Sequence, residues 1–193
     1  MKKRLKIYLF RHGQTVYNGA GTFTGWINSR LTKKGREDAK IVAERLKDKK
    51  FEIAFHTSLS RSKNTLKKVL KYHPECKTLI MDDRMIERNY GNLNKHTHWQ
   101  IVQKYGPKEY DLWHRSFNTR PPKGESFADV EKRVKSFLKD LIEIMKKEKV
   151  NVAISAHGNS IRLFRKIMEK ASKEETVKWF IPYDTYYEYT IHA

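Results

Sequence analysis

Two histidines and two arginines stand in short polar segments that could act on an anionic group. Arg11 and His12 lie together in segment 9–15, Leu-Phe-Arg-His-Gly-Gln-Thr, and Arg61 and His157 follow further along the chain. A neutral imidazole, with an ordinary pKa of about 6.5, can act as a nucleophile near neutral pH. A guanidinium offers a planar fork of donors that matches phosphate oxygens. These residue types suit phosphoryl transfer, with His12 as nucleophile, Arg11 and Arg61 binding phosphate, and His157 as a further donor when protonated.

A carboxyl group that could serve as general acid and base is Glu87, in segment 86–91, Ile-Glu-Arg-Asn-Tyr-Gly. It precedes a segment that we expect to cover the site, where shielding from water would help it to donate a proton to a leaving oxygen. Taken singly, each of these residues is more often an ordinary surface or core residue. The hypothesis depends on their joint occurrence at the ends of predicted strands.

The elements that must position these residues alternate between strands and helices. Short apolar runs predict strands over 5–10, 51–55, 78–81 and 150–155, and a final edge strand over 185–191. Helices are predicted after Thr32, after Thr57 and Ser58, after Ser126, and over 160–170. This alternation predicts an α/β fold, a three-layer α/β/α sandwich with a mostly parallel central sheet. Such sheets hold their sites at the carboxyl ends of the strands.

The chain of 193 residues has the length of one globular domain, so we expect a single domain over 1–193. Residues 88–124 interrupt the alternation with turn signals and aromatic side chains. The aromatic residues are Trp99, Tyr105, Tyr110, Trp113 and Phe117. We interpret this segment as a partly helical cap insertion, at about 88–124.

Forty-one Lys and Arg against 22 Asp and Glu give a net charge of +19, which predicts attraction to anions such as phosphorylated metabolites, nucleic acid or acidic membranes. The lysines are scattered, so much of this charge could be solvated surface. No apolar run is long enough for a signal peptide or membrane span, and the single Cys76 suits a reducing compartment. We expect a cytoplasmic protein with no membrane partner, and we leave open whether it is a homo-oligomer.

Two other classes of function are compatible with parts of the sequence. His96 and His98 could suggest a metal site, but there is no HExxH motif and no Cys/His cluster, so we expect no metal. A nucleic-acid-binding module is a remote alternative, because aromatic residues accompany Lys and Arg between 95 and 120. No helix-turn-helix, RNP or zinc-finger signature supports it, so we expect no nucleic-acid partner.

The order of these segments resembles the histidine phosphatase superfamily and, within it, the cofactor-dependent phosphoglycerate mutases. The resemblance runs nearly end to end. The superfamily signature is similar to segment 9–15, and its second Arg and second His match Arg61 and His157. The mutase branch is similar in segments 23–26, Phe-Thr-Gly-Trp, and 87–91, Glu-Arg-Asn-Tyr-Gly.

The resemblance implies a mutase-like fold and a 2,3-bisphosphoglycerate-dependent phosphoglycerate mutase. Such an enzyme would interconvert 3-phosphoglycerate and 2-phosphoglycerate through a phosphohistidine at His12, with 2,3-bisphosphoglycerate as primer and Glu87 exchanging the proton. The small phosphorylated substrate would be held by Asn18, Thr24, Gly25, Arg88, Tyr90, Lys95 and Arg115. The backbone near Gly158 and Asn159 is expected to stabilise the transferring phosphoryl group.

Some segments depart from the mutase pattern. His114 replaces the first Arg of a Trp-Arg-Arg triplet, the loop between Gly91 and Leu93 is shorter, and no segment matches the mutases' long C-terminal tail. Because that tail shields the phosphoenzyme from water, we expect a greater share of hydrolysis. Segment 122–126 also resembles the phosphatase branches. The alternative is a phosphohistidine-type phosphatase, a histidine acid-type phosphomonoesterase hydrolysing small phosphate monoesters.

Overall fold

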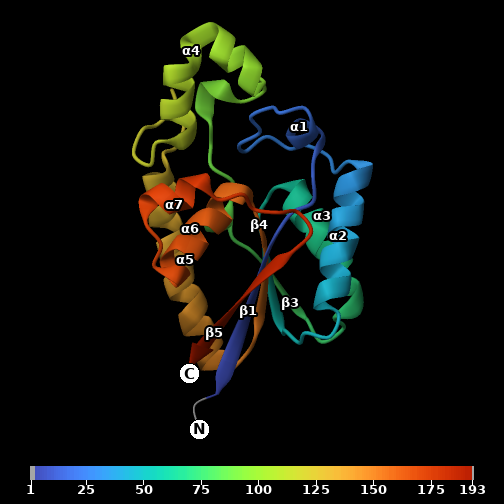
Figure 1. Ribbon diagram of the computed structural model, residues 1–193. Helices are drawn as coiled ribbons and strands as arrows, with labels where there is room; N and C mark the ends of the chain where they lie inside the picture. Colours follow the sequence, from blue (N-terminus) through green and yellow to red (C-terminus); the bar gives the residue numbers. More distant parts are fainter. Residues whose placement is uncertain (1–2, 193) are drawn as a thin grey trace.

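The structure is a computed structural model that describes residues 3–192, built around one mixed sheet (Figure 1). Its strands are β1 (Arg4–Arg11), β2 (Ile53–His56), β3 (Thr78–Met81), β4 (Val152–Ala156) and β5 (Tyr186–His192), in the order β3-β2-β4-β1-β5. The first four run parallel, and β5 lies antiparallel to β1 at one edge. The predicted α/β fold with a mostly parallel sheet is confirmed.

Helices cover both faces of this sheet (Figure 1). On one face lie α2 (Lys33–Leu46) and α3 (Ser60–Val69), and on the other α5 (Phe127–Glu148) and α6 (Gly158–Glu169). Strand β1 contributes to both apolar cores because its side chains alternate. Leu5, Ile7 and Leu9 pack in the core beneath α5 and α6, whereas Tyr8 and Phe10 pack in the core beneath α2 and α3.

The N-termini of α2, α3 and α5 test the helix starts that the sequence predicted. Thr32 caps α2 by accepting a hydrogen bond from the Gly35 amide (2.9 Å), as predicted. A helix was expected after Ser126, and this residue caps α5 by accepting from the Asp129 amide (3.1 Å). Segment 57–61 was expected to cap and open the next helix, and α3 does begin within it, at Ser60, but without a side-chain cap. The Thr57 hydroxyl is instead engaged with His157, at 2.8 Å from its Nε2.

The remaining elements join or cover this framework. They are α1 (Val16–Gly19), the short 3₁₀ turns η1 (Leu70–Tyr72), η2 (Asp83–Met85) and η3 (Gly91–Leu93), α4 (His98–Arg115) and α7 (Lys173–Lys178). Helix α4 projects at one end of the molecule and is broken at Gly106, which has a φ of 83° and precedes Pro107 (Figure 1). The boundaries of a cap at about 88–124 stay a prediction. Among residues 3–192, no helix has both the length and the apolar character needed to cross a membrane.

Candidate active site

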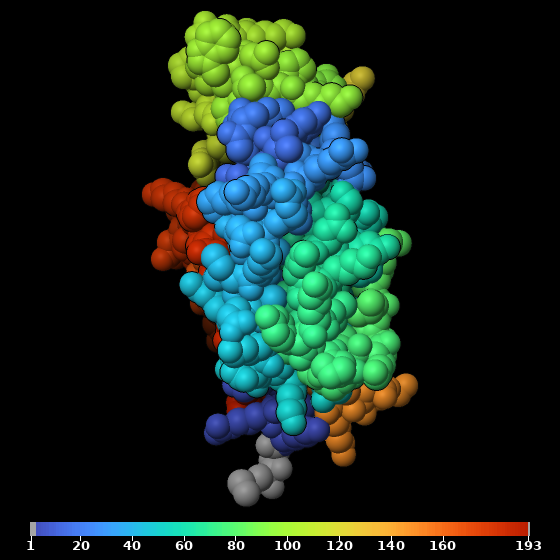
Figure 2. Space-filling model, turned by 90° about the vertical axis from the view of Figure 1, so that its right-hand side faces the viewer, coloured from blue at the N-terminus to red at the C-terminus, as the bar shows by residue number. Residues whose placement is uncertain are grey.

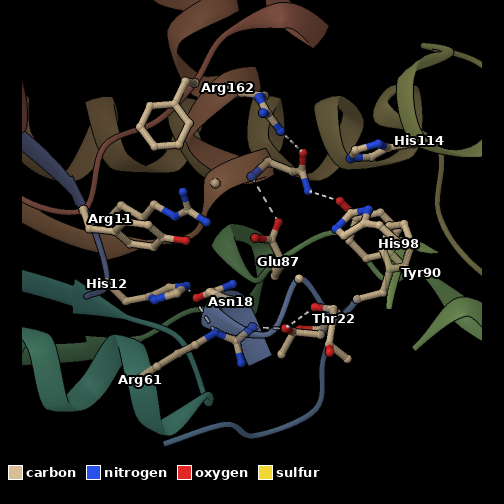
Figure 3. Close-up of a pocket in the computed structure, with 18 residues that line it drawn as sticks. Arg11, His12, Asn18, Thr22, Arg61, Glu87, Tyr90, His98, His114 and Arg162 are labelled. Carbon is tan, nitrogen blue, oxygen red and sulfur yellow. Dashed lines mark hydrogen bonds between the residues drawn. The ribbon is translucent and has the colours of Figure 1, made fainter. Parts of the chain in front are cut away.

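The carboxyl ends of three neighbouring strands meet at one edge of the sheet. His12 directly follows β1, Arg61 lies in the first turn of α3 after β2, and His157 directly follows β4. A pocket of about 220 Å³ opens here, and Figure 3 shows His12, Arg61 and Glu87 converging on it. Of the residues predicted from sequence, those that line the pocket are Arg11, His12, Asn18, Thr24, Gly25, Arg61, Glu87, Tyr90, Gly158 and Asn159.

The turn that carries His12 is held tightly against the start of α2. The Gly13 amide donates to the Thr65 hydroxyl (3.1 Å). A Cβ atom on Gly13 would lie 2.0 Å from the Gly35 carbonyl oxygen, and a Cβ on Gly35 would lie 1.9 Å from the carbonyl oxygen of Gln14. Both positions therefore require glycine, and this close packing fixes the imidazole relative to the sheet.

The His12 ring is oriented and polarised for attack by one particular nitrogen. Its Nδ1 lies 2.8 Å from the carbonyl oxygen of Gly13, so Nδ1 carries the proton and donates it. The other nitrogen, Nε2, then holds a lone pair and faces the pocket. Burial, reinforced by the charges of Arg61 and Arg11, lowers the pKa of His12 well below its ordinary value. The imidazole is therefore neutral at physiological pH, as a nucleophile must be.

Arg61 is buried beside this nucleophile and is fixed by backbone carbonyl groups. Its Nε donates to Nε2 of His12 (3.2 Å), and its two terminal nitrogens donate to the carbonyl oxygens of Ile27 (2.7 Å) and Gly25 (2.8 Å). Burial lowers the pKa of Arg61 to about 10, so the guanidinium keeps its charge at neutral pH. A fixed positive charge next to Nε2 suits stabilisation of a phosphoryl group on that atom.

Two buried nitrogen atoms at this edge lack a hydrogen-bond partner within the described part of the chain. They are Nε of Arg11 and Nδ1 of His157. Arg11 is otherwise held by the Ile181 carbonyl oxygen (2.7 Å) and stacks on Tyr183, and the His157 ring centre lies 5.0 Å from that of His12. Buried polar atoms are rarely left unpaired, so Nε of Arg11 points to an anion that belongs here, and Nδ1 of His157 would donate as well in the tautomer in which the Thr57 hydroxyl donates to Nε2. His157 does not itself line the pocket, but sits directly behind His12.

Glu87 enters the pocket from the irregular segment after η2. Its Oε1 accepts hydrogen bonds from the amides of Arg88 (2.8 Å) and Asn159 (3.0 Å). Its carbonyl oxygen is held by Nε1 of Trp26 (2.7 Å) and by Arg133 (3.0 Å). These contacts fix the carboxyl group in a buried position. The backbone amides that donate to Oε1 could donate in the same way to the side-chain oxygen of a glutamine.

The start of α6 supplies a second layer of polar contacts. The Asn159 amide side chain donates to the Tyr90 hydroxyl (2.9 Å) and accepts from Arg162 (2.6 Å). Arg162 also donates from Nε to the Trp179 carbonyl oxygen (2.8 Å), and burial lowers its pKa to about 10. Gly158 lets the Arg11 guanidinium approach closely, because a Cβ there would lie 3.3 Å from its central carbon. Arg162 therefore brings a third arginine, after Arg11 and Arg61, to the pocket wall.

The loop after α1 forms the floor of the pocket. Asn18 accepts hydrogen bonds at its Oδ1 from both the amide (3.1 Å) and the hydroxyl (2.9 Å) of Thr15. Thr24 is buried, and Gly25 has a φ of 49°, a left-handed conformation that favours glycine. The strained turn at Gly25 aims its carbonyl oxygen at Arg61.

The wall farthest from the sheet is aromatic. Phe23 packs against Tyr90 and His98, with ring centres 4.7 Å and 4.2 Å apart, and His98 lies 5.0 Å from His114. Burial, followed by the charge of Arg115, lowers the pKa of His114 to about 2 and also lowers that of His98. Both rings are neutral, so this wall offers shape and hydrogen bonds without charge.

Three of the predicted substrate-binding residues lie away from the pocket. Arg88 is fully buried and donates to the carbonyl oxygens of Glu125 (2.7 Å) and Trp113 (2.6 Å), so it joins α4 to the segment that precedes α5. Lys95 is exposed, with a left-handed φ of 70°. Arg115 is exposed and donates to the Val177 carbonyl oxygen (2.9 Å). Sequence matching placed these three residues in a site that their side chains do not reach here.

Some pocket residues were missed by sequence reasoning. Those that line the pocket without having been predicted include Thr22, Phe23, His98, His114, Arg162, Phe180 and Tyr183. Arg162 had a usable signal: it lies three residues after Asn159 in one helix, and residues at this spacing share a helix face. Phe23 and His114 lie in segments that resemble the mutase pattern, whereas Phe180 and Tyr183 had no signal, because they come from a loop whose path is set by tertiary packing.

Comparison with known proteins agrees with the resemblance seen in the sequence. The family model for "Histidine phosphatase superfamily (branch 1)" matches residues 7–192. The chain is 34% identical over 174 residues to the 2,3-bisphosphoglycerate-dependent phosphoglycerate mutase of Bartonella henselae, which covers 89% of this chain and 84% of that protein.

Two solved structures show that this fold serves more than one activity. Phosphoglycerate mutase from Bacillus anthracis superposes with a TM-score of 0.80 at 22% identity, covering 99% of this chain and 89% of that one. A mycobacterial glucosyl-3-phosphoglycerate phosphatase also superposes with a TM-score of 0.80 at 22% identity, covering 97% of both chains. At this identity the likeness shows the fold alone.

Proposed function

This chain belongs to the histidine phosphatase superfamily (branch 1), and we propose that it is a 2,3-bisphosphoglycerate-dependent phosphoglycerate mutase acting in the cytoplasm. Membership makes it an enzyme, either a mutase or a phosphatase. The observation that carries the proposal is the state of His12, whose Nδ1–H is bound by the Gly13 carbonyl group while Nε2 faces Arg61. The mutase relative supports phosphoglycerate as the substrate.

The proposed reaction has two displacements. In the first, a hydroxyl group of bound phosphoglycerate gives its proton to Glu87 and attacks the phosphoryl group on His12; an O–P bond forms, the N–P bond breaks, Nε2 recovers its lone pair, and 2,3-bisphosphoglycerate results. In the second, Nε2 attacks the phosphorus at the neighbouring carbon, an N–P bond forms, and the P–O bond breaks as Glu87 returns the proton to the leaving oxygen. Arg11, Arg61 and His157 would stabilise the equatorial oxygens throughout.

The pocket fits the primer that this function implies. The unpaired Nε of Arg11 and Nδ1 of His157 would meet one phosphoryl group, and the buried Arg162 would neutralise the carboxylate or the second phosphoryl group. When bound, 2,3-bisphosphoglycerate would supply the phosphoryl group that loads His12. We assign this neutralising role to Arg162 in place of Lys95 and Arg115, which the resemblance implied as substrate-binding residues. Asn18, Thr24, Gly25 and Tyr90 would shape the site around the substrate.

A phosphatase is the second candidate, and the far wall of the pocket favours it. Lys95 and Arg115 point elsewhere, and the buried His114 ring is neutral. A wall with so little charge holds a second anionic group less firmly than a wall with several cations. The monoester product would then leave before the phosphoryl group returns, and water would take that group from His12.

One incubation separates these two functions. The enzyme is given 3-phosphoglycerate with and without 2,3-bisphosphoglycerate, and 2-phosphoglycerate and free phosphate are quantified. A mutase gives 2-phosphoglycerate as the main product, with a rate that depends on the primer. Free phosphate released in step with substrate loss, with or without primer, would instead establish a phosphatase. His12→Ala serves as the inactive control in both arms.

A further inference from the structure

A second concave site lies between α2 and α3, on the side of these helices that faces away from the sheet. The hollow has a volume of about 790 Å³ and is lined by Arg30, Leu31, Arg36, Ser60, Asn64, Lys67, Lys68 and Lys71. Figure 2 looks onto this face, where the atoms of α2 (blue to cyan) lie beside those of α3 (teal). None of these residues lines the catalytic pocket, so the two sites have separate walls.

The lining of this hollow carries one sign of charge. Five of its side chains are cationic, and none is a carboxylate. Across residues 3–192, no ion pair is formed by Arg30, Arg36, Lys67, Lys68 or Lys71. The nearest carboxylates of α2 are engaged by their own helix, Glu37 with Lys40 and Glu44 with Lys47. Clustered cations without counter-charges repel one another and create a field that attracts anions.

The arrangement of the cations favours a long anion over a single phosphate. Lys67 and Lys71 are four residues apart, which corresponds to a rise of about 6 Å along a helix. Arg30 and Arg36 form the facing wall. A second hollow of about 420 Å³ shares Lys68 and Lys71, but it is also lined by Lys40, which pairs with Glu37, and by Glu44, which pairs with Lys47. Among the described residues, the track of unpaired cations is therefore the one in the first hollow, between the start of α2 and α3.

We propose that this groove binds an oligophosphate, a chain of three or more linked phosphates. Paired walls of Lys and Arg can contact successive phosphates of such a chain from both sides. The first hollow has no aromatic lining among the described residues, and its single apolar side chain is Leu31. Binding of single-stranded nucleic acid usually adds aromatic rings on which bases stack. The phosphate chain, present in both inorganic polyphosphate and a nucleoside triphosphate, is the part that the groove recognises.

The test uses tripolyphosphate, ATP and a longer inorganic polyphosphate as probes, with amide chemical shifts of isotope-labelled protein to report where each binds. The groove variant is Lys67→Gln/Lys68→Gln/Lys71→Gln. The matched control is Lys132→Gln/Lys139→Gln/Lys146→Gln, which removes the same charge from exposed positions of α5 on the opposite face. Retained turnover in both variants verifies folding, since none of these residues belongs to the catalytic pocket.

We expect tripolyphosphate to shift amides over 64–71. The groove variant should bind it about tenfold more weakly than wild type, and the control should stay within about twofold. Tighter binding of the long polyphosphate than of ATP would identify inorganic polyphosphate as the natural source, and the reverse order would identify a nucleotide. The proposal is overturned if shifts occur only near His12 and His157, or if both variants lose affinity equally. Binding of a single-stranded oligonucleotide without tripolyphosphate binding would overturn it too.

Discussion

Nε of Arg61 donates a hydrogen bond to Nε2 of His12 over 3.2 Å, so the proposed nucleophilic atom is already in contact with the charge that would stabilise its product. The same guanidinium is fixed by the carbonyl oxygens of Gly25 and Ile27. The hydrogen bond to Nε2 breaks when that lone pair attacks phosphorus, but the two carbonyl contacts are preformed and keep the guanidinium beside the reacting atom with little reorganisation. The planar shape of the Arg61 guanidinium, as well as its charge, therefore contributes to the contacts with His12, Gly25 and Ile27.

Arg61→Lys tests this geometry. The lysine keeps a positive charge but cannot contact Gly25, Ile27 and His12 together. We expect kcat to fall by about 10²-fold or more, the range found when one preorganised donor is lost. Steady-state kinetics measures the change, with the exposed Arg45→Lys as a control that stays near wild type. A value within threefold of wild type would mean that charge alone suffices at this position.

Glu87→Gln tests proton transfer. Glutamine can still accept from the Arg88 and Asn159 amides, so the local structure should persist. We expect the phosphoryl-transfer step to slow by about 10²- to 10⁴-fold, with phosphate affinity changed by less than about threefold. Single-turnover measurements separate transfer from binding, with the exposed Glu143→Gln as control. Unchanged transfer would remove Glu87 from the chemistry.

Arg162→Ala and Arg115→Ala test which arginine meets the substrate's second anionic group. Arg162 lines the pocket, whereas Arg115 donates to the Val177 carbonyl group outside it. We expect Arg162→Ala to raise KM for phosphoglycerate about tenfold or more, as loss of a charged hydrogen bond does. Arg115→Ala and Lys95→Ala should change KM by less than about twofold. The opposite order would show that α4 closes onto the substrate and brings these cations inward.

Acid stability tests the buried neutral histidines. Burial lowers the pKa of His12, His157 and His114, so the folded chain stays neutral at these rings where the unfolded chain takes up protons, below about pH 6.5. Each ring therefore leaves the free energy of unfolding unchanged above about pH 6.5. Below that pH, each ring reduces the free energy of unfolding by up to about 1.4 kcal/mol per pH unit. Urea unfolding at pH 7.5, 6.0 and 5.0 measures this slope. His114→Gln should reduce the slope of the unfolding free energy against pH, and the exposed His96→Gln should leave that slope unchanged. Equal slopes for wild type and both variants would contradict the claim that His114 stays neutral in the folded chain.

The sheet and its strand-end residues could be predicted because periodicity and connectivity determine them. His12 and His157 directly follow buried strands, and β1, β4 and β2 are adjacent in the sheet, so His12, Arg61 and His157 must meet. Thr32 and Ser126 carried local capping signals that the structure retains. These predictions depended on short-range rules that tertiary packing seldom overrides.

The far side of the pocket could not be predicted in this way. The Gly106–Pro107 pair that breaks α4 was a turn signal in the sequence, but the left-handed backbone at Lys95, which sets where that side chain lies, does not follow from periodicity. Arg88 was matched to a substrate-binding residue, but the buried carbonyl groups of Glu125 and Trp113 satisfy its guanidinium. Residue identity predicted the chemistry near the sheet, while loop geometry determined which side chains complete the site.

The central claim is that His12 carries the phosphoryl group, and intact-protein mass spectrometry after brief incubation with 2,3-bisphosphoglycerate tests it directly. We predict one added phosphoryl group that is labile in acid and stable in base, located at His12 by peptide fragmentation. His12→Ala should show no such adduct and should lose turnover by about 10⁴-fold or more while remaining folded. An adduct on another residue, or turnover retained in His12→Ala, would contradict the account.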